Sequence, residues 1–209
     1  MINTILVEDD PYIQELFAQR LTSDERFYLV KSVRDAFESE TLCNKDIDLV
    51  LMDVQTLHRH SGLASGKRIR ENWPHIKVVI MTSLVDPEVL AKARAGCADS
   101  LWYKEQGVGE LLDVCQRTIQ GEHIFPDQPP EIEMADISSR DINPVQLEIL
   151  RCHIRGMSYQ DIGRKFGISK DGVRWHIREL VRKGGFENTE ALFTAAVEGK
   201  LIVTTLKDE

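Results

Sequence analysis

Acidic side chains directly follow two apolar runs of this chain. The pair Glu8-Asp9 follows residues 3–7, and Asp53 follows the largely apolar run 48–52. Runs of this kind are typical of buried parallel strands, which deliver the residues after them to one edge of the sheet, where ligands bind. Carboxylates gathered there repel one another unless a hard cation joins them, and Mg²⁺ prefers such oxygen ligands. The spacing therefore predicts a magnesium site.

A hydroxyl and an ammonium group are expected at the same edge. Thr82 follows the apolar run 78–81, and Lys104 follows the run 100–103. Together with the acids they suit a phosphoryl group carried on a carboxylate. The competing interpretation is that acids at strand ends serve as turn and cap residues, and Asp10-Pro11 does resemble an N-cap followed by proline at the first helical position.

Strand and helix patterns alternate through the first part of the chain. Strands are expected near 3–8, 27–33, 48–52, 76–81 and 99–103, and helices near 11–22, 35–43, 62–72, 86–96 and 108–120. This alternation predicts an α/β fold with a doubly wound, five-stranded parallel sheet. The prolines at 126, 129 and 130 then suggest a linker, since repeated proline blocks helix and central strand alike. We therefore expect domains over 1–121 and 141–209, joined by a linker over 122–140.

The second part predicts a small all-α domain. Asn143-Pro144-Val145-Gln146 is a variant capping box, and the helix that it starts ends at Gly156. Further helices are expected from Ser158 to Gly167, from Ser169 to the glycine pair at 184–185, and over 190–198. A short helix, a tight turn with glycine and a longer helix predict a helix-turn-helix.

The third of these helices has two different faces. Val173, Ile177, Leu180 and Val181 fall on one side and are expected to pack, while Arg174, Trp175, Arg178 and Arg182 cluster on the other. Arginines four residues apart can follow a groove of DNA, touching bases and phosphates. A solvated charged face is the alternative, but a tryptophan on the polar side favours contact with an apolar group such as a thymine methyl.

The uneven distribution of charge indicates that the two parts of the chain have different functions. Residues 1–136 carry 14 basic and 24 acidic residues, a net charge of −10, whereas residues 137–209 carry 12 and 10, a net charge of +2. A mildly basic part inside an acidic chain is a reason to expect nucleic-acid contact there.

Several classes of protein are disfavoured by composition. No apolar run approaches the ~20 residues of a membrane span, and the N-terminus runs straight into a strand rather than a signal peptide. The cysteines are widely spaced, which argues against a zinc site and gives no disulfide framework: they are Cys43, Cys97, Cys115 and Cys152. A cytoplasmic protein with reduced thiols and no membrane partner is expected.

The order of acid pair, single Asp, Thr and Lys resembles the receiver domain of two-component response regulators over residues 1–121. The resemblance implies that Asp53 accepts a phosphoryl group from a partner histidine kinase, that Thr82 senses the phosphoryl oxygens, and that Lys104 pairs with them. It also implies a Mg²⁺ ion held by Glu8, Asp9, Asp53 and the backbone carbonyl of Gln55. The strand order 2-1-3-4-5 is likewise borrowed from that fold.

Residues 141–200 resemble the DNA-binding domain of the LuxR/NarL family. The matching stretches are Gly156-x-Ser158-x-x-Asp161-Ile162-Gly163, Gly167-Ile168-Ser169, Val173-Arg174-x-His176 and Lys183-x-Gly185-Phe186-x-Asn188-Thr189-Glu190-Ala191. The resemblance implies that the helix from Ser169 to Lys183 enters the major groove of promoter DNA and that the fourth helix makes a homodimer contact. The DNA-binding residues that we expect are Ser158, Ser169, Lys170, Arg174, Trp175, Arg178, Arg182 and Lys183.

Some positions depart from the two families. The loop after Asp53 lacks the usual Met-Pro and reaches Gly62 one residue later than usual. Leu101 stands where receivers usually carry Tyr or Phe, so we expect weak coupling between phosphorylation and dimerisation. His58-Arg59-His60 could form a metal or anion site, although an exposed loop is the preferred interpretation.

The sequence therefore predicts a DNA-binding transcriptional response regulator rather than an enzyme. One alternative is a regulator that works without phosphorylation. Another is a Mg²⁺-dependent phosphohydrolase with an aspartyl-phosphate intermediate. One large family of that kind has a second acid two residues after the nucleophile, where this chain has Gln55, and the helix-turn-helix would have no role there.

Overall fold

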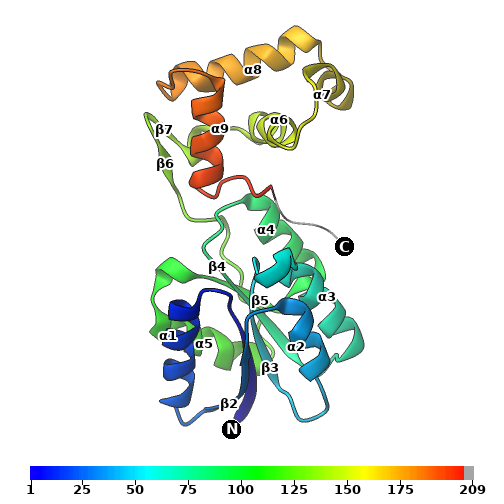
Figure 1. The fold of residues 1–209 in the computed structure, drawn as a ribbon, viewed down its shortest axis with the longest axis vertical. Coiled ribbons are helices and arrows are strands. Elements are labelled where there is room, and N and C mark those ends of the chain that lie inside the picture. The colour runs from blue at the N-terminus through cyan, green and yellow to red at the C-terminus, as the bar shows by residue number, and fades with distance from the viewer. Residues whose placement is uncertain (205–209) are drawn as a thin grey trace. The chain divides into compact units, whose positions relative to one another are not determined.

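A computed structural model describes residues 1–204, which divide into two compact units, residues 1–129 and residues 130–204 (Figure 1). Each unit encloses its own core. The first contains the carboxyl-terminal strand edge predicted above, and the second contains the helix-turn-helix.

The first unit is a five-stranded parallel sheet with the strand order β2-β1-β3-β4-β5. The strands are β1 (Ile2–Val7), β2 (Phe27–Val33), β3 (Leu49–Asp53), β4 (Lys77–Thr82) and β5 (Ser100–Tyr103). The crossover helices are α1 (Pro11–Thr22), α2 (Ala36–Leu42), α3 (Gly62–Asn72), α4 (Pro87–Lys92, followed by a π-helical turn over Ala93–Cys97) and α5 (Val108–Ile119). Helices α1 and α5 cover one face of the sheet, and α2, α3 and α4 cover the other (Figure 1). The predicted doubly wound fold is confirmed.

Local sequence explains where these elements begin. Asp10 caps α1, with its Oδ1 accepting hydrogen bonds from the amides of Tyr12 and Ile13 at 2.8 and 3.1 Å. Asp35 and Asp86 cap α2 and α4 in the same way. The central strands β3 and β4 are buried on both faces, so their apolar runs are continuous rather than alternating.

The second unit combines a short hairpin with helices. Its elements are β6 (Glu133–Met134), β7 (Ile137–Ser138), α6 (Pro144–Ile154), α7 (Tyr159–Phe166), α8 (Lys170–Lys183) and α9 (Thr189–Glu198). The antiparallel hairpin β6–β7 lies in the segment that the sequence predicts as linker. It can form because the prolines stop at Pro130 and because Met134 and Ile137, both 3% exposed, bury their side chains. No helix within residues 1–204 is both long and apolar enough to cross a membrane.

Candidate functional site

The acidic side chains predicted at the strand ends lie together. Glu8 follows β1 and Asp53 is the last residue of β3, and carboxylate oxygens of Glu8, Asp9 and Asp53 all lie within 4.8 Å of one another. The Lys104 ammonium, directly after β5, donates to Glu8 Oε2 at 2.6 Å and to Asp53 Oδ2 at 2.9 Å. Glu8 is 1% exposed and Asp53 is 7% exposed, so one cation balances a largely buried cluster of acids.

Burial controls the electrostatics of Asp53. Loss of solvation and the neighbouring Glu8 carboxylate together raise its pKa to about 7, against the opposing charge of Lys104. A hydrogen bond of 2.7 Å from the Val54 amide to Asp53 Oδ1 favours the charged form. Burial lowers the pKa of Lys104, but Asp53 and Glu8 together shift that pKa above its ordinary value. The site therefore favours the charged form of Lys104 and makes Asp53 easier to protonate than an exposed carboxyl group.

Thr82 ends β4 beside this cluster of acids. Its side chain is fully buried, and its Oγ1 accepts a hydrogen bond of 3.0 Å from the Leu84 amide, which leaves the hydroxyl proton available as a donor. In the sheet Thr82 pairs with Tyr103, the residue before Lys104.

Tyr103 supplies an aromatic ring that the sequence reasoning missed. Successive residues of a strand face opposite ways. Trp102 packs with α1, 6.1 Å from the ring of Phe17, whereas Leu101 and Tyr103 share the other face. Tyr103 is 1% exposed, and within residues 1–204 its hydroxyl has no hydrogen-bond partner. The face with Leu101 therefore does carry a ring, two residues later than expected.

Gly62 fixes the distance between α3 and Asp53. A Cβ at Gly62 would clash with Asp53, because it would lie 1.8 Å from the carbonyl oxygen and 2.8 Å from the carbonyl carbon of that residue. The Gly62 amide donates to the Val54 carbonyl at 3.0 Å. The longer loop after Asp53 therefore still brings its glycine against the backbone of the acidic residue.

The extra residue of that loop is absorbed in a left-handed turn. His58 and Arg59 have φ values of 60° and 63°. Non-glycine residues in this conformation cost about 1–2 kcal/mol each, so the surrounding contacts must hold them there.

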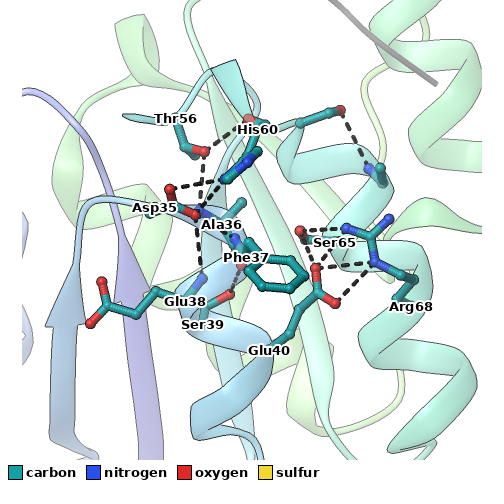
Figure 2. A network of polar contacts seen from close by, with 12 residues as sticks. Asp35, Ala36, Phe37, Glu38, Ser39, Glu40, Thr56, His60, Ser65 and Arg68 are labelled. Carbon is teal, nitrogen blue, oxygen red and sulfur yellow. Dashed lines mark hydrogen bonds and ion pairs between the residues drawn. The ribbon is translucent and has the colours of Figure 1, made fainter. Parts of the chain in front are cut away.

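Figure 2 shows how the loop is anchored to the start of α2. The His60 ring nitrogen Nδ1 lies 2.9 Å from both carboxylate oxygens of Asp35, and the Thr56 hydroxyl donates to the His60 carbonyl at 2.8 Å. Burial raises the pKa of Asp35, but the hydrogen bond with His60 and the backbone amides shifts it below its ordinary value. Beside this anchor lies a cavity of about 290 Å³, lined by Asp9, Val54, Gln55, Thr56, Arg59, His60 and Ser61.

In the second unit α7 and α8 form the predicted helix-turn-helix. Gly167 ends α7 in the left-handed conformation with φ 67°, and Ser169 caps α8 by accepting a 3.0 Å hydrogen bond from the Gly172 amide. The turn is tight, because a Cβ at Gly163 would lie 2.7 Å from the Ile168 carbonyl oxygen. Ser158 caps α7. Both serines that were expected to bind DNA therefore also serve as helix caps.

Helix α8 presents its charged side to solvent. Val173, Ile177 and Leu180 are buried, whereas Trp175 is 58% exposed. Three basic side chains form exposed ion pairs within the helix, Arg174 with Asp171 and both Arg182 and Lys183 with Glu179. Lys170 and Arg178 form no hydrogen bond or ion pair with their side chains inside the described part of the chain. The face is basic and carries one large aromatic ring.

Two protein-family patterns match this chain. The response regulator receiver domain matches residues 4–116, more than half of the chain, and a winged helix-turn-helix DNA-binding pattern matches residues 143–184. The first range covers all five strands of the parallel sheet except the first two residues of β1, and the second covers α6, α7 and α8.

Relatives match along most of their length. The chain is 26% identical over 212 residues to the uncharacterized transcriptional regulatory protein YxjL of Bacillus subtilis, covering 95% of this chain and 96% of the relative. It is 26% identical over 188 residues to the nitrate/nitrite response regulator NarP of Escherichia coli, covering 86% of each. These names are those of regulators of transcription rather than of enzymes.

Solved structures share the fold. RcsB from Salmonella enterica serovar Typhimurium, bound to the promoter rprA with the phosphomimetic BeF3−, matches with a TM-score of 0.60 and 20% identity, over 93% of this chain and 98% of that one. A DNA-binding response regulator of the LuxR family from Staphylococcus aureus matches with a TM-score of 0.54 and 21% identity, over 57% of this chain and 99% of that one. The chain therefore belongs to the response regulators of the NarL/LuxR family, two-component proteins that join a receiver domain to a helix-turn-helix DNA-binding domain.

Proposed function

We propose that Asp53 accepts a phosphoryl group from a partner histidine kinase and that this controls promoter binding by a dimer of the chain. The observation that carries the proposal is the convergence of Glu8, Asp9 and Asp53 around the single ammonium of Lys104. A buried cluster with more acids than cations is costly by itself, and it becomes favourable when a divalent cation joins it.

The donor set fits Mg²⁺. Glu8, Asp9, Asp53 and the Gln55 backbone carbonyl would hold the ion, since all offer hard oxygen ligands and Gln55 lines the same cavity as Asp9. When bound, the ion would neutralise charge on the phosphoryl oxygens.

The side chains of the site have different roles in phosphoryl transfer. One Asp53 oxygen forms a bond to phosphorus as the bond from phosphorus to the donor breaks, and the donor leaves with that electron pair. Lys104 is already 2.9 Å from Asp53 Oδ2 and would pair with a phosphoryl oxygen. The Thr82 hydroxyl can donate a hydrogen bond to another phosphoryl oxygen. Neutralisation by fixed charges of this kind is the main way proteins promote phosphoryl transfer.

Asp53→Asn should abolish phosphorylation by a small phosphodonor in the presence of Mg²⁺, because the amide has no nucleophilic carboxylate oxygen. Intact-protein mass spectrometry measures the added phosphoryl group. Equal labelling of the variant would show that another residue accepts the group. Promoter binding that is the same with and without the label would instead favour a regulator that works without phosphorylation.

Mg²⁺ affinity should depend on pH around neutrality. Because burial raises the pKa of Asp53 to about 7 in the metal-free site, a proton competes with the cation below that pH. The apparent affinity should level off above about pH 8 and fall by up to about tenfold per pH unit below about pH 7. Calorimetric titration measures the affinity. Asp53→Asn is the control: it should bind Mg²⁺ more weakly, and its affinity should not change with pH in this range. A flat profile for the unsubstituted protein would remove Asp53 from the ligand set.

For DNA we propose that α8 lies in the major groove. Arg174, Trp175 and Arg178 would face base edges, and Ser158, Ser169, Lys170, Arg182 and Lys183 would lie near phosphates. The exposed basic face of α8 supports this, because ion pairs between exposed side chains are weak and yield readily to phosphates. One related RcsB structure contains dimers bound to DNA, which supports binding as a dimer.

Substitutions along α8 should separate two kinds of contact. Arg174→Ala or Arg178→Ala should weaken operator binding by about 1–3 kcal/mol and leave binding to random DNA nearly unchanged, because an Arg–guanine pair reads sequence. Lys183→Ala should weaken both alike and lower the slope of log K against log salt by about one unit. Salt titrations on both duplexes measure these effects. If the arginine variants lose both affinities equally, α8 does not read bases.

A further inference from the structure

Arg59 lines the same cavity as Asp9 and has no side-chain partner among residues 1–204. Within residues 1–204 its guanidinium makes no hydrogen bond or ion pair, and its side chain is exposed. The two other cations near the acids are already engaged. Lys104 contacts two carboxylates, and the Arg34 guanidinium donates to the Asp9 carbonyl at 2.9 and 2.7 Å.

The position of Arg59 is set by the loop and not by its own side chain. Its amide donates to the Thr56 carbonyl at 3.2 Å, and its φ of 63° is left-handed. The neighbouring contacts hold this turn: the Leu57 amide donates to the Arg34 carbonyl at 2.9 Å, and His60 is held by Asp35. The extra loop residue thus presents an arginine at a fixed place on the wall of the cavity.

That cavity lies next to the acid pair and to the loop that follows Asp53. It is lined by Asp9 from the acid pair and by Val54 and Gln55, the two residues after Asp53. Its volume of about 290 Å³ is large enough for a phosphoryl group with a small leaving group. The lining contains one acid, Asp9, and the Arg59 guanidinium on the same wall can offset its repulsion of an incoming dianion.

We propose that Arg59 binds the phosphoryl oxygens of the incoming phosphodonor in this cavity and so favours donors whose net charge is doubly negative. The inference rests on the proposed phosphorylation of Asp53 and adds a residue that determines donor specificity. Phosphoryl transfer itself is unchanged: the bond from phosphorus to the donor breaks as the bond to Asp53 forms, and Arg59 keeps all of its protons.

The test is the rate of labelling against donor concentration, with acetyl phosphate or phosphoramidate as donor and Mg²⁺ present. For Arg59→Ala the half-saturating acetyl phosphate concentration should rise about tenfold, as expected for loss of one charge-assisted contact, with the maximal rate nearly unchanged. Phosphoramidate has a smaller net negative charge, because its protonated nitrogen offsets part of the charge of the phosphoryl group, so its half-saturating concentration should change less. Arg59→Lys should recover part of the loss, and Mg²⁺ affinity should not fall in any of these variants.

Two further variants make the result decisive. Arg20→Ala removes an exposed arginine near the far end of α1 and should label like the unsubstituted protein. Arg59→Gly removes the same charge but fits the left-handed backbone, so its kinetic loss should equal that of Arg59→Ala.

The inference is overturned if Arg59→Ala behaves like Arg20→Ala. It is also overturned if only the maximal rate falls, or if Arg59→Gly labels normally, since the alanine effect would then come from the backbone. Labelling of Asp53→Asn, or no labelling of the unsubstituted protein by either donor, would instead contradict the proposed function itself.

Discussion

Gly62→Ala should lower the free energy of unfolding of the first unit by about 3 kcal/mol or more, at the upper end of what overpacking costs. The added Cβ would lie 1.8 Å from the Asp53 carbonyl oxygen and 2.8 Å from its carbonyl carbon, and these backbone atoms cannot rotate aside as the Met52 side chain, 2.9 Å away, could. Any relief must move α3 or the end of β3. Phosphorylation should therefore slow in the fraction that remains folded, because Asp53 itself is displaced.

Gly109→Ala is the matched control for this substitution. Gly109 lies in α5, and a Cβ there would have no neighbour within 4 Å, so alanine should stabilise the helix by about 0.5–1 kcal/mol. Urea unfolding of both variants measures the difference. Equal stability of the two would mean that Gly62 does not approach Asp53 as closely as described.

Lys104→Met should lower the free energy of unfolding by about 3–5 kcal/mol near pH 8 without divalent cations. The lysine donates to Glu8, which is 1% exposed, and to Asp53, so its loss leaves buried carboxylates without a counter-charge. If the same acids hold Mg²⁺ as proposed, adding Mg²⁺ should recover a large part of the loss. Denaturation with Mg²⁺ and with a chelator measures both effects.

Lys67→Met is the control for Lys104→Met, because it removes an exposed lysine instead of a largely buried one. Its ion pair with Glu71 spans 3.9 Å between side chains that are 62% and 61% exposed, and exposed helical pairs contribute about 0.3–0.5 kcal/mol. The stability of this variant should hardly respond to Mg²⁺. Similar losses in both variants would mean that the Glu8–Asp53 cluster is better solvated than its burial indicates.

Much of the fold was predictable because its signals are local. Caps such as Asp10-Pro11 and the apolar runs before Asp53 and Thr82 mark their elements within a few residues, and the predicted α1 and α3 match the observed helices. The hairpin β6–β7 escaped prediction because two-residue strands carry no periodicity.

The candidate site was less completely predictable. Glu8, Asp9, Asp53 and Lys104 each lie at or just after the end of a parallel strand. Parallel strands end at one edge of the sheet, so the sequence predicted that these side chains come together. The contact between His60 and Asp35 joins residues 25 positions apart through a left-handed turn, and no spacing rule reports it. The ring of Tyr103 was missed because the family pattern places the aromatic residue at position 101, and nothing in that pattern points to a ring two residues later.

The loop between Asp53 and Gly62 has fixed ends and an adaptable middle. The bond from the Gly62 amide to the Val54 carbonyl fixes one end beside the reacting carboxylate, while the surplus residue is taken up by the turn at His58 and Arg59. For protein engineering this makes the segment 56–61 an exchangeable loop. Loops of other lengths and charges could be grafted there to alter which donor is accepted, provided that the glycine and the amide bond to Val54 are retained.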